Sequence, residues 1–255
     1  MSLPEAIIPC AQIVEKGDPL RFRTVMAAPV EARAVLFPLY ALNVEVSRAP
    51  WVTQEAMIAE MRLQWWRDAL EEIAEGKPVR KHEVTTPLAD VLSPAQAKRL
   101  DESVAARRWD IYKDAFEDQA HMDAYIDQTA GHLMWTACEL LGAPSEAEPA
   151  VRDLAFVAGT AAFLRAVPEL AEANRIPLLD GTGKGLQELA LRAFDKGRRP
   201  KLGKHARPGL WPAIGALCTL DQVIRDTSAV AEARLDPGVT PFRLARTALL
   251  GRLVL

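Results

Sequence analysis

The sequence predicts an all-α protein. Apolar residues recur at three- and four-residue spacing along most of the chain, which is the spacing that places side chains on one face of a helix. Runs of alternating β-branched residues, which are typical of half-buried strands, are almost absent. The 255 residues contain no internal repeat, no low-complexity segment and no long linker. We therefore expect one all-α domain over residues 1–255.

The composition is typical of a globular protein that can bury a sizeable core. Hydrophobic residues make up 49% of the chain and charged residues 25%. The net charge of −3 indicates no general affinity for nucleic acid. Cys10, Cys138 and Cys218 are scattered, which favours reduced thiols and a cytoplasmic location. We see no signal peptide and no apolar run near the ~18 residues that span a bilayer.

The first half of the chain divides into helices at glycine and proline. A short helix over 3–16 ends at Gly17, and Asp18-Pro19 offers an N-cap and a first-turn proline for the next helix, over 20–27. Pro29 begins a core helix in which Pro38 predicts a kink or the first turn.

A break at 49–51 precedes a tryptophan-rich helix that ends at 76–78. Its expected apolar stripe is Met61, Trp65, Ala69 and Ile73. Of the adjacent Trp65 and Trp66, we expect one in the core and one at its rim. Residues 77–92 form a loop or a short helix.

The second half continues the helical pattern. Ser93-Pro94 opens a helix to about residue 107, with a further helical stretch over 110–116, and 118–141 is a long helix. Ser145 and Glu148 have capping-box spacing before the next helix, which Pro168 should kink or end. Residues 180–209 are the loosest region, apart from a helical pattern over 186–194. The last helices are expected over 208–220, 221–234 and 241–253.

Several motifs stand out over roughly residues 18 to 180. Arg33 precedes Leu39-Tyr40-Ala41-Leu42, and the Trp-rich Leu63-Gln64-Trp65-Trp66-Arg67-Asp68 follows. Further along are Trp109-Asp110, Tyr125, Ala130-Gly131 and the stretch 164–178. Together these motifs resemble those of the squalene/phytoene synthase family, which implies an isoprenoid-synthase-type helical bundle around a central apolar pocket. The resemblance also implies an ancestral reaction that joins two allylic diphosphates with Mg²⁺.

The aspartates that hold Mg²⁺ in the resembled family are missing here. Counted from Tyr40, the first pair falls on Ser47 and Trp51, and the second pair falls on Ala166 and Leu170. Magnesium requires oxygen ligands, which tryptophan, alanine and leucine side chains cannot supply. We therefore predict no metal site and no catalytic residue. Glu45 and Glu169 are the nearest substitutes, ahead of the pairs Asp110/Asp114 and Asp123/Asp127, which we interpret as solvated helix faces.

Seven residues are candidates for contacting a ligand in the implied pocket. They are Tyr40, Asn43, Glu45, Ser47, Arg48, Arg165 and Arg175. The arginines could meet a diphosphate without metal, because guanidinium pairs with phosphate oxygens, or they could form structural ion pairs. The glycines around Lys184 fail the phosphate-loop pattern, and we interpret them as a flexible loop.

Lys196 to Arg207 carries six basic residues and no acid. It is either a solvated loop or a peripheral contact with the inner face of an anionic membrane. The last helix combines three arginines with apolar residues, and we expect it to dock on the domain rather than to lie on a membrane.

Two hypotheses follow from these observations. The first is a non-catalytic relative of the squalene/phytoene synthases. Asn43-Val44-Glu45 and Met61 to Trp66 resemble the branch that contains mitochondrial complex I assembly factors. That resemblance implies a prenyl diphosphate or lipid ligand, a respiratory-complex subunit as partner and no cofactor. The alternative is a working prenyltransferase with a rearranged metal site, which would use Mg²⁺.

Overall fold

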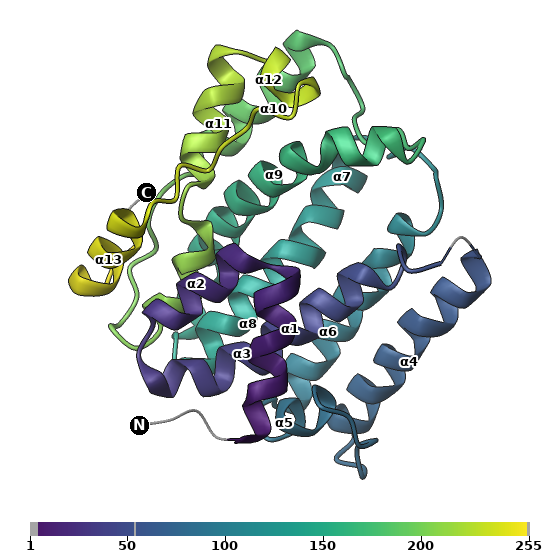
Figure 1. The fold of residues 1–255 in the computed structure, drawn as a ribbon, viewed down its shortest axis with the longest axis vertical. Helices are drawn as coiled ribbons and strands as arrows, with labels where there is room; N and C mark the ends of the chain where they lie inside the picture. Colours follow the sequence, from purple (N-terminus) through teal and green to yellow (C-terminus); the bar gives the residue numbers. More distant parts are fainter. Residues whose placement is uncertain (1–4, 54, 254–255) are drawn as a thin grey trace.

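The computed structural model describes residues 5–53 and 55–253, and helices dominate this part of the chain (Figure 1). It contains no β-strand in these residues, which agrees with the predicted all-α class. The α-helices are α1 (Ile8–Gly17), α2 (Pro19–Ala27), α3 (Val30–Arg48), α4 (Ala56–Ala74), α5 (Thr85–Ala89), α6 (Pro94–Ala106), α7 (Gln119–Ile126), α8 (His132–Leu140), α9 (Glu148–Glu172), α10 (Gly183–Phe194), α11 (Ala216–Arg225), α12 (Ser228–Ala231) and α13 (Pro241–Leu250). Short 3-10 helices are η1 (Glu5–Ile7), η2 (Arg107–Asp110), η4 (Ser145–Ala147) and η5 (Arg207–Ala213), and η3 (Asp127–Gly131) is a π-helix.

Helix α9 is the element around which much of the bundle is arranged. It contacts η3, α7 and α8 on the side of the earlier helices, and η5, α10, α11 and α12 on the side of the later ones. Figure 1 shows it running through the middle of the molecule, with α10 to α12 beyond it. Helix α3 packs on α1, α2, α5 and α8, while α4 pairs with α6 at one edge. The space between α3 and α9 is therefore bounded by helices from both halves of the chain.

Two of the three predicted N-caps are confirmed. The Asp18 carboxylate accepts a hydrogen bond from the Arg21 backbone amide at 2.9 Å and begins α2. The Ser93 and Gln96 side chains exchange hydrogen bonds with each other's backbone amides and begin α6. The predicted capping box at Ser145 is wrong, because η4 separates that residue from α9, and no side chain caps α9.

Two predicted boundaries are also wrong. Gly215 adopts a φ of +84° and separates η5 from α11, so the expected helices over 208–220 and 221–234 are divided at different points. The expected helical stretch over 110–116 ends with η2 at Asp110. Of the two outcomes predicted for Pro168, a kink or the end of the helix, the second does not occur, because α9 continues to Glu172. Of the helix predicted over 3–16, residues 3 and 4 lie outside the described residues.

The predicted apolar stripe of α4 is confirmed at Ala69 and Ile73 and is wrong at Met61. Met61 is 66% exposed, and the buried side chains of α4 are Ala59, Leu63, Trp66, Ala69, Leu70 and Ile73. Trp66 lies in the core, while the Arg80 guanidinium lies 5.1 Å from the Trp65 ring centre, so the expectation of one core and one rim tryptophan is confirmed. The predicted and observed stripes therefore share Ala69 and Ile73 and diverge in the N-terminal half of the helix, where Leu63 rather than Met61 is buried.

The expectation that no apolar segment reaches membrane-spanning length is wrong. Ser145–Glu172 has the length and the mean hydropathy, 1.4, of a membrane-crossing helix. More than half of its apolar window, 56%, is buried within the bundle, as is common for the core helix of a globular domain. Its apolar character thus coincides with its place in the protein interior.

Candidate functional site

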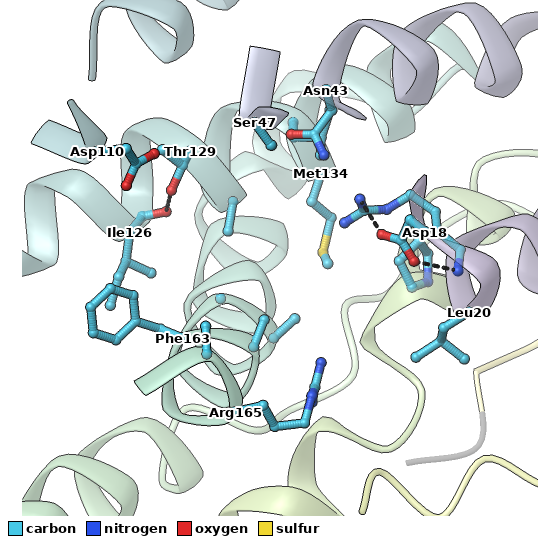
Figure 2. A pocket seen from close by; sticks show the side chains of 18 of the residues that line it. Asp18, Leu20, Asn43, Ser47, Asp110, Ile126, Thr129, Met134, Phe163 and Arg165 are labelled. Atoms are coloured by element: carbon cyan, nitrogen blue, oxygen red, sulfur yellow. Dashed lines mark hydrogen bonds and ion pairs between the residues drawn. The ribbon is translucent and has the colours of Figure 1, made fainter. Parts of the chain in front are cut away.

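A cavity of about 810 Å³ lies between α3 and α9. Its walls come from α2 and α3 on one side, from α7, η3 and α8 behind, and from α9, η5 and the start of α11 on the other side. In Figure 2, Asn43 and Ser47 of α3 lie across the cavity from Arg165 of α9. Ligand pockets typically measure ~300–1,000 Å³ and are mostly apolar with a few polar groups, and this cavity has both properties.

All four positions where the resemblance places metal-binding aspartates line this one cavity. Ser47 and Trp51 come from α3 and the turn after it, and Ala166 and Leu170 come from α9. The structure thus brings together two segments more than a hundred residues apart, at positions that the sequence comparison had paired. Three of the four side chains have no oxygen to offer a metal ion, so these residues do not fit Mg²⁺.

Other carboxylates in the cavity wall do not replace the missing set. Asp18 pairs with Arg21 at 2.7 Å, and Asp110 pairs with Arg107 at 3.1 Å, so both are already neutralised. Glu169 and Glu172 also line the cavity. Among the residues that the structure describes, however, no three His, Cys, Asp or Glu side chains come together in a way that could hold a metal ion.

The remaining acidic candidates are engaged elsewhere. Asp123 accepts hydrogen bonds from Arg192, one of them at 2.8 Å, and Asp127 accepts one from Arg152 at 2.9 Å. Glu45 pairs with Arg48 at 3.2 Å, and neither residue is among those that line the cavity. The predicted ligand-contacting residues Glu45 and Arg48 are therefore placed away from the site, in the structural ion pair that was the alternative.

Asp110, Arg107 and Tyr125 form a buried polar network in the cavity wall. The Tyr125 hydroxyl donates to Asp110 Oδ1 at 2.8 Å, and Arg107 Nη1 donates to Asp110 Oδ2 at 3.1 Å and to the Tyr125 oxygen at 2.9 Å. Burial raises the pKa of the Tyr125 hydroxyl far above its ordinary value, with Arg107 opposing this shift. Tyr125 is therefore neutral in the folded protein, and the network is a fixed hydrogen-bond donor and acceptor set.

Arg165 is the cavity arginine with the fewest partners. Its Nη1 donates to Thr219 Oγ1 at 3.4 Å, and no carboxylate forms an ion pair with it within residues 5–53 and 55–253. Burial lowers the pKa of Arg165, and the charge of Asp18 opposes this effect. The guanidinium nevertheless remains protonated, as arginine does in proteins. It is an incompletely compensated positive charge facing an apolar cavity, which is the electrostatic setting for binding an anion.

Tyr40 and Asn43, two of the residues predicted to contact a ligand, also line the cavity. The Tyr40 side chain is almost fully buried, and its hydroxyl has no hydrogen-bond partner among the described residues. Burial raises the pKa of that hydroxyl as well. The Arg21 guanidinium lies 5.0 Å from the Tyr40 ring centre. Tyr40 therefore offers a neutral hydroxyl to a ligand at this side of the cavity.

Arg175 is not among the residues that line the cavity, but it contacts two that do, Trp51 and Asp110. Its guanidinium lies over the Trp51 ring, and it donates hydrogen bonds to the backbone carbonyls of Asp110 and Tyr112, the latter at 2.8 Å. These contacts connect the segment after α9 to the segment after η2. Arg175, which was predicted to contact a ligand, is thus placed behind one of the substituted aspartate positions.

The back wall depends on a close helix crossing. A Cβ atom on Gly159 of α9 would lie 2.7 Å from Ala130 Cβ and 2.8 Å from Ile126 Cγ2. Ala130 belongs to the π-helix η3, and the Thr129 hydroxyl bonds the Tyr125 carbonyl there at 2.7 Å. Only glycine permits this approach, and all four residues Ile126, Thr129, Ala130 and Gly159 line the cavity.

Sequence reasoning missed Asp18, Arg21 and Arg107 as cavity residues. The sequence indicates Asp18 as a helix cap, and the structure adds a second hydrogen bond, from the Arg21 side chain. The acid-arginine spacing at Asp18/Arg21 and at Arg107/Asp110 was the available signal, since residues three apart on a helix are neighbours. Their position on the cavity could not be found without the tertiary structure.

The sequence and the fold are both similar to those of known squalene/phytoene synthases. Residues 14–179 match the model of the squalene/phytoene synthase family. A squalene synthase, HpnC, from Alicyclobacillus acidocaldarius has a similar structure, with a TM-score of 0.71 and 15% identity over 88% of this chain and 94% of that one. A dehydrosqualene synthase crystallised with a ligand gives a TM-score of 0.63 and 13% identity over 97% and 95% of the two chains. These two likenesses describe the fold.

The curated relatives carry a different name. A Drosophila melanogaster protein, described as a homologue of NADH dehydrogenase (ubiquinone) complex I assembly factor 6, is 30% identical over 177 residues, or 67% of this chain and 53% of its own. The Homo sapiens complex I assembly factor 6 is 24% identical over 172 residues, or 62% of this chain and 48% of its own. The chain therefore spans about half the length of the curated relatives it matches.

Proposed function

The chain belongs to the squalene/phytoene synthase family, and we propose that within it this protein binds an isoprenoid or similar lipid without condensing it and takes part in assembling a respiratory complex. The observation that carries the proposal is the substitution of all four metal-binding positions on a cavity that is still present. Ser47, Trp51, Ala166 and Leu170 all line one cavity of about 810 Å³. The cavity has kept the size of a ligand pocket, while these four positions no longer supply a metal site.

The lining of the cavity indicates the class of ligand. Ile126, Leu133, Met134 and Phe163 present apolar surface, and Arg165 presents a positive charge that no carboxylate pairs with among the described residues. A molecule with a long apolar chain and an anionic head matches both features. A prenyl diphosphate or prenyl phosphate has this chemistry. In the metal-bearing pattern Mg²⁺ would neutralise the diphosphate. Here Arg165 supplies a positive charge that, unlike those of Arg21 and Arg107, is not paired with a carboxylate among the described residues.

The assembly role rests on the relatives. Proteins named complex I assembly factor 6 in fly and mammals match about two thirds of this chain. Loss of the metal positions fits such a role, because a scaffold for assembly needs the fold and its surface but not the ionisation of a diphosphate. A working prenyltransferase with a rearranged metal site is the alternative, and no grouping of carboxylates among the described residues favours it.

Thermal unfolding with defined ligands tests the binding proposal. Farnesyl and geranylgeranyl diphosphate, each with Mg²⁺ and then with a chelator, should stabilise the protein equally in both conditions. A ligand at a hundred times its Kd adds ~2.7 kcal/mol of stability, which is a shift of roughly 5–10 °C for a chain of this size. A shift that requires Mg²⁺, or formation of a hydrocarbon product, would contradict the proposal.

Two variants assign the effect to the cavity. Arg165→Gln should reduce the stabilisation by the diphosphates while leaving that by the matching prenyl alcohol unchanged. Arg62→Gln removes an exposed arginine from α4, away from the cavity, and should behave as the unmodified protein. If Arg165→Gln loses binding to the diphosphate and to the alcohol equally, the substitution has damaged the fold. Circular dichroism of each variant shows whether the helical structure is intact.

Deletion of the gene in its host tests the assembly role. The expected result is a lower amount of assembled NADH:ubiquinone oxidoreductase on native gels, with subcomplexes accumulating. The unmodified gene should restore assembly, and the Arg165→Gln gene then shows whether ligand binding is required. An unchanged level of assembled complex would overturn this part of the proposal while leaving the binding result intact.

A further inference from the structure

The C-terminal helix α13 has an outward face that nothing in the described structure covers. Phe242 is 78% exposed, and Leu249 is 89% exposed. Leu244 and Thr247 are buried and attach the helix to the bundle, where it contacts α2. At ~100° per residue, Phe242, Arg246 and Leu249 lie on one stripe opposite these two anchors. Helix α13 therefore docks on the domain, as predicted from the sequence, through the face that carries Leu244 and Thr247. The opposite face, with Phe242, Arg246 and Leu249, is exposed to solvent.

The basic segment over 196–207 lies next to this helix. Arg207 Nη1 donates to the Gly251 carbonyl at 3.3 Å, so the end of the segment is joined to the end of α13. Figure 1 shows the green connection between α10 and η5 passing alongside the yellow α13. Arg198, Arg199 and Lys201 are exposed. Among the described residues, none of these three forms an ion pair. Lys196, at the start of the segment, does pair with Asp153, at 2.7 Å.

The charge of the chain is divided very unevenly between this surface and the rest. Residues 196–207 carry six basic side chains, residues 237–255 carry three, and neither segment has an acidic residue. Because the whole chain has a net charge of −3, these two segments are +9 and the remainder is −12. A surface that is both basic and apolar, on an acidic protein, is complementary to an anionic lipid surface, where basic residues meet head groups and apolar side chains enter the interface.

We propose that the outward face of α13 together with residues 196–207, here called the basic face, docks the protein on an anionic lipid bilayer. Phe242, Leu249 and Leu250 enter the interfacial region, and the surrounding arginines and lysines contact lipid phosphates. The proposal concerns a surface outside the cavity and does not depend on which ligand the cavity holds. Docking there would also bring the cavity near the bilayer, from which an apolar ligand could enter. Helix α13 contacts α2, and α2 contributes Leu20 and Arg21 to the cavity wall.

Vesicle co-sedimentation of the full chain tests the proposal. The protein should bind vesicles that contain phosphatidylglycerol and should not bind vesicles of phosphatidylcholine alone. Raising the salt from ~0.1 M to ~1 M shortens the screening length from ~10 Å to ~3 Å and should weaken binding strongly. Absence of binding to the anionic vesicles at low salt would overturn the proposal.

Matched variants locate the contact. Neutralising Arg198, Arg199 and Lys201 to Gln should lower the partition coefficient on the order of 100-fold, and Phe242→Ser with Leu249→Ser should lower it at least ~10-fold. The controls are the triple change of Arg62, Lys98 and Lys113 to Gln, and Met57→Ser with Met61→Ser, which alter exposed residues elsewhere. Equal loss in the controls would overturn the assignment to the basic face.

The same variants distinguish a protein partner from a membrane. If a second copy covers α13, the unmodified protein will sediment as a dimer without lipid, and Phe242→Ser with Leu249→Ser will convert it to a monomer. That result would overturn the proposal. Arg165→Gln should keep full vesicle binding, so failure of the proposed cavity ligand and failure of the membrane contact give different results.

Discussion

The guanidinium of Arg175 lies 4.6 Å from the centre of the Trp51 ring. Trp51 stands at a position where the resembled family has a metal-binding aspartate, and Arg175 comes from the segment just after α9, which carries the opposite pair. A cation over an aromatic ring contributes ~0.5–1 kcal/mol at an exposed site. The segments that carry the two sets of substituted aspartate positions are thus connected by a contact between an arginine and a tryptophan.

Restoring the four carboxylates should create a metal site. Ser47→Asp, Trp51→Asp, Ala166→Asp and Leu170→Asp together place four like charges around one cavity, so we expect lower stability without metal. Millimolar Mg²⁺ should then raise the melting temperature by several degrees, roughly 2–4 °C for each kcal/mol of binding. The matching Asn variant is the control and should not respond to Mg²⁺. A lack of response in the Asp variant would mean that the positions do not converge as described.

Gly159→Ala should destabilise the protein. The added methyl group would meet Ala130 Cβ at 2.7 Å, and neither helix can move without opening the cavity wall. Overpacking of this kind costs ~1–3 kcal/mol. Chemical denaturation measures the loss, and Gly181→Ala is the control because a Cβ there meets nothing within 4 Å. Equal stability of the two variants would contradict the close crossing of α9 and η3.

Asp110→Ala should cost far more stability than Tyr125→Phe. Removing the carboxylate leaves the Arg107 guanidinium without its ion-pair partner in a largely buried position, a loss of ~3–5 kcal/mol. Removing the hydroxyl leaves the ion pair in place and costs ~1–3 kcal/mol. Urea unfolding of both variants gives the ranking. The reverse order would show that the hydroxyl, rather than the ion pair, organises this wall.

Stability should fall on acidification through His132. Burial lowers the pKa of His132, the charge of Arg152 adds to this, and Asp127 and Glu102 oppose it. In the unfolded chain the pKa is ~6.5. Below that pH the unfolded state takes up a proton that the folded state does not, so the free energy of unfolding decreases as the pH falls from ~6.5 toward the lower folded value.

The measurement is urea unfolding at several pH values between neutral and mildly acidic, with His132→Gln as the comparison. The variant should lose less stability than the unmodified protein over the same range. Parallel curves for the two proteins would show that His132 does not titrate differently in the folded and unfolded states.

Much of the fold could be predicted from the sequence because helical periodicity and caps are local. Asp18 and Ser93 identify helix starts from a few neighbouring residues, and the structure confirms both. The N-terminal half of the buried stripe of α4 was predicted wrongly because Met61 is apolar yet exposed, and the position of α6 decides which face is covered. Periodicity alone does not contain that information.

The candidate site, too, could be predicted from the sequence only in part. Tyr40, Asn43, Ser47 and Arg165 line the cavity as the motifs indicated, since each motif lies on a helix that faces the interior. Arg48 and Glu45 do not, because at ~100° per residue they lie on a different face of α3 from Tyr40, Asn43 and Ser47, where they pair with each other. Asp18, Arg21 and Arg107 reach the cavity through helix packing, which no short motif records.

The π-helix η3 makes the number of residues between α7 and α8 critical. One π turn holds one residue more than the α-helical turn that would otherwise continue α7 into α8. Deleting a single residue such as Gln128 would allow regular α-helix and rotate α8 by ~100° relative to α7. Leu133 and Met134 would then leave the cavity wall, and Cys138 would leave its contact with Gly209. Homologous chains that keep this cavity should therefore tolerate substitutions in η3 more readily than insertions or deletions.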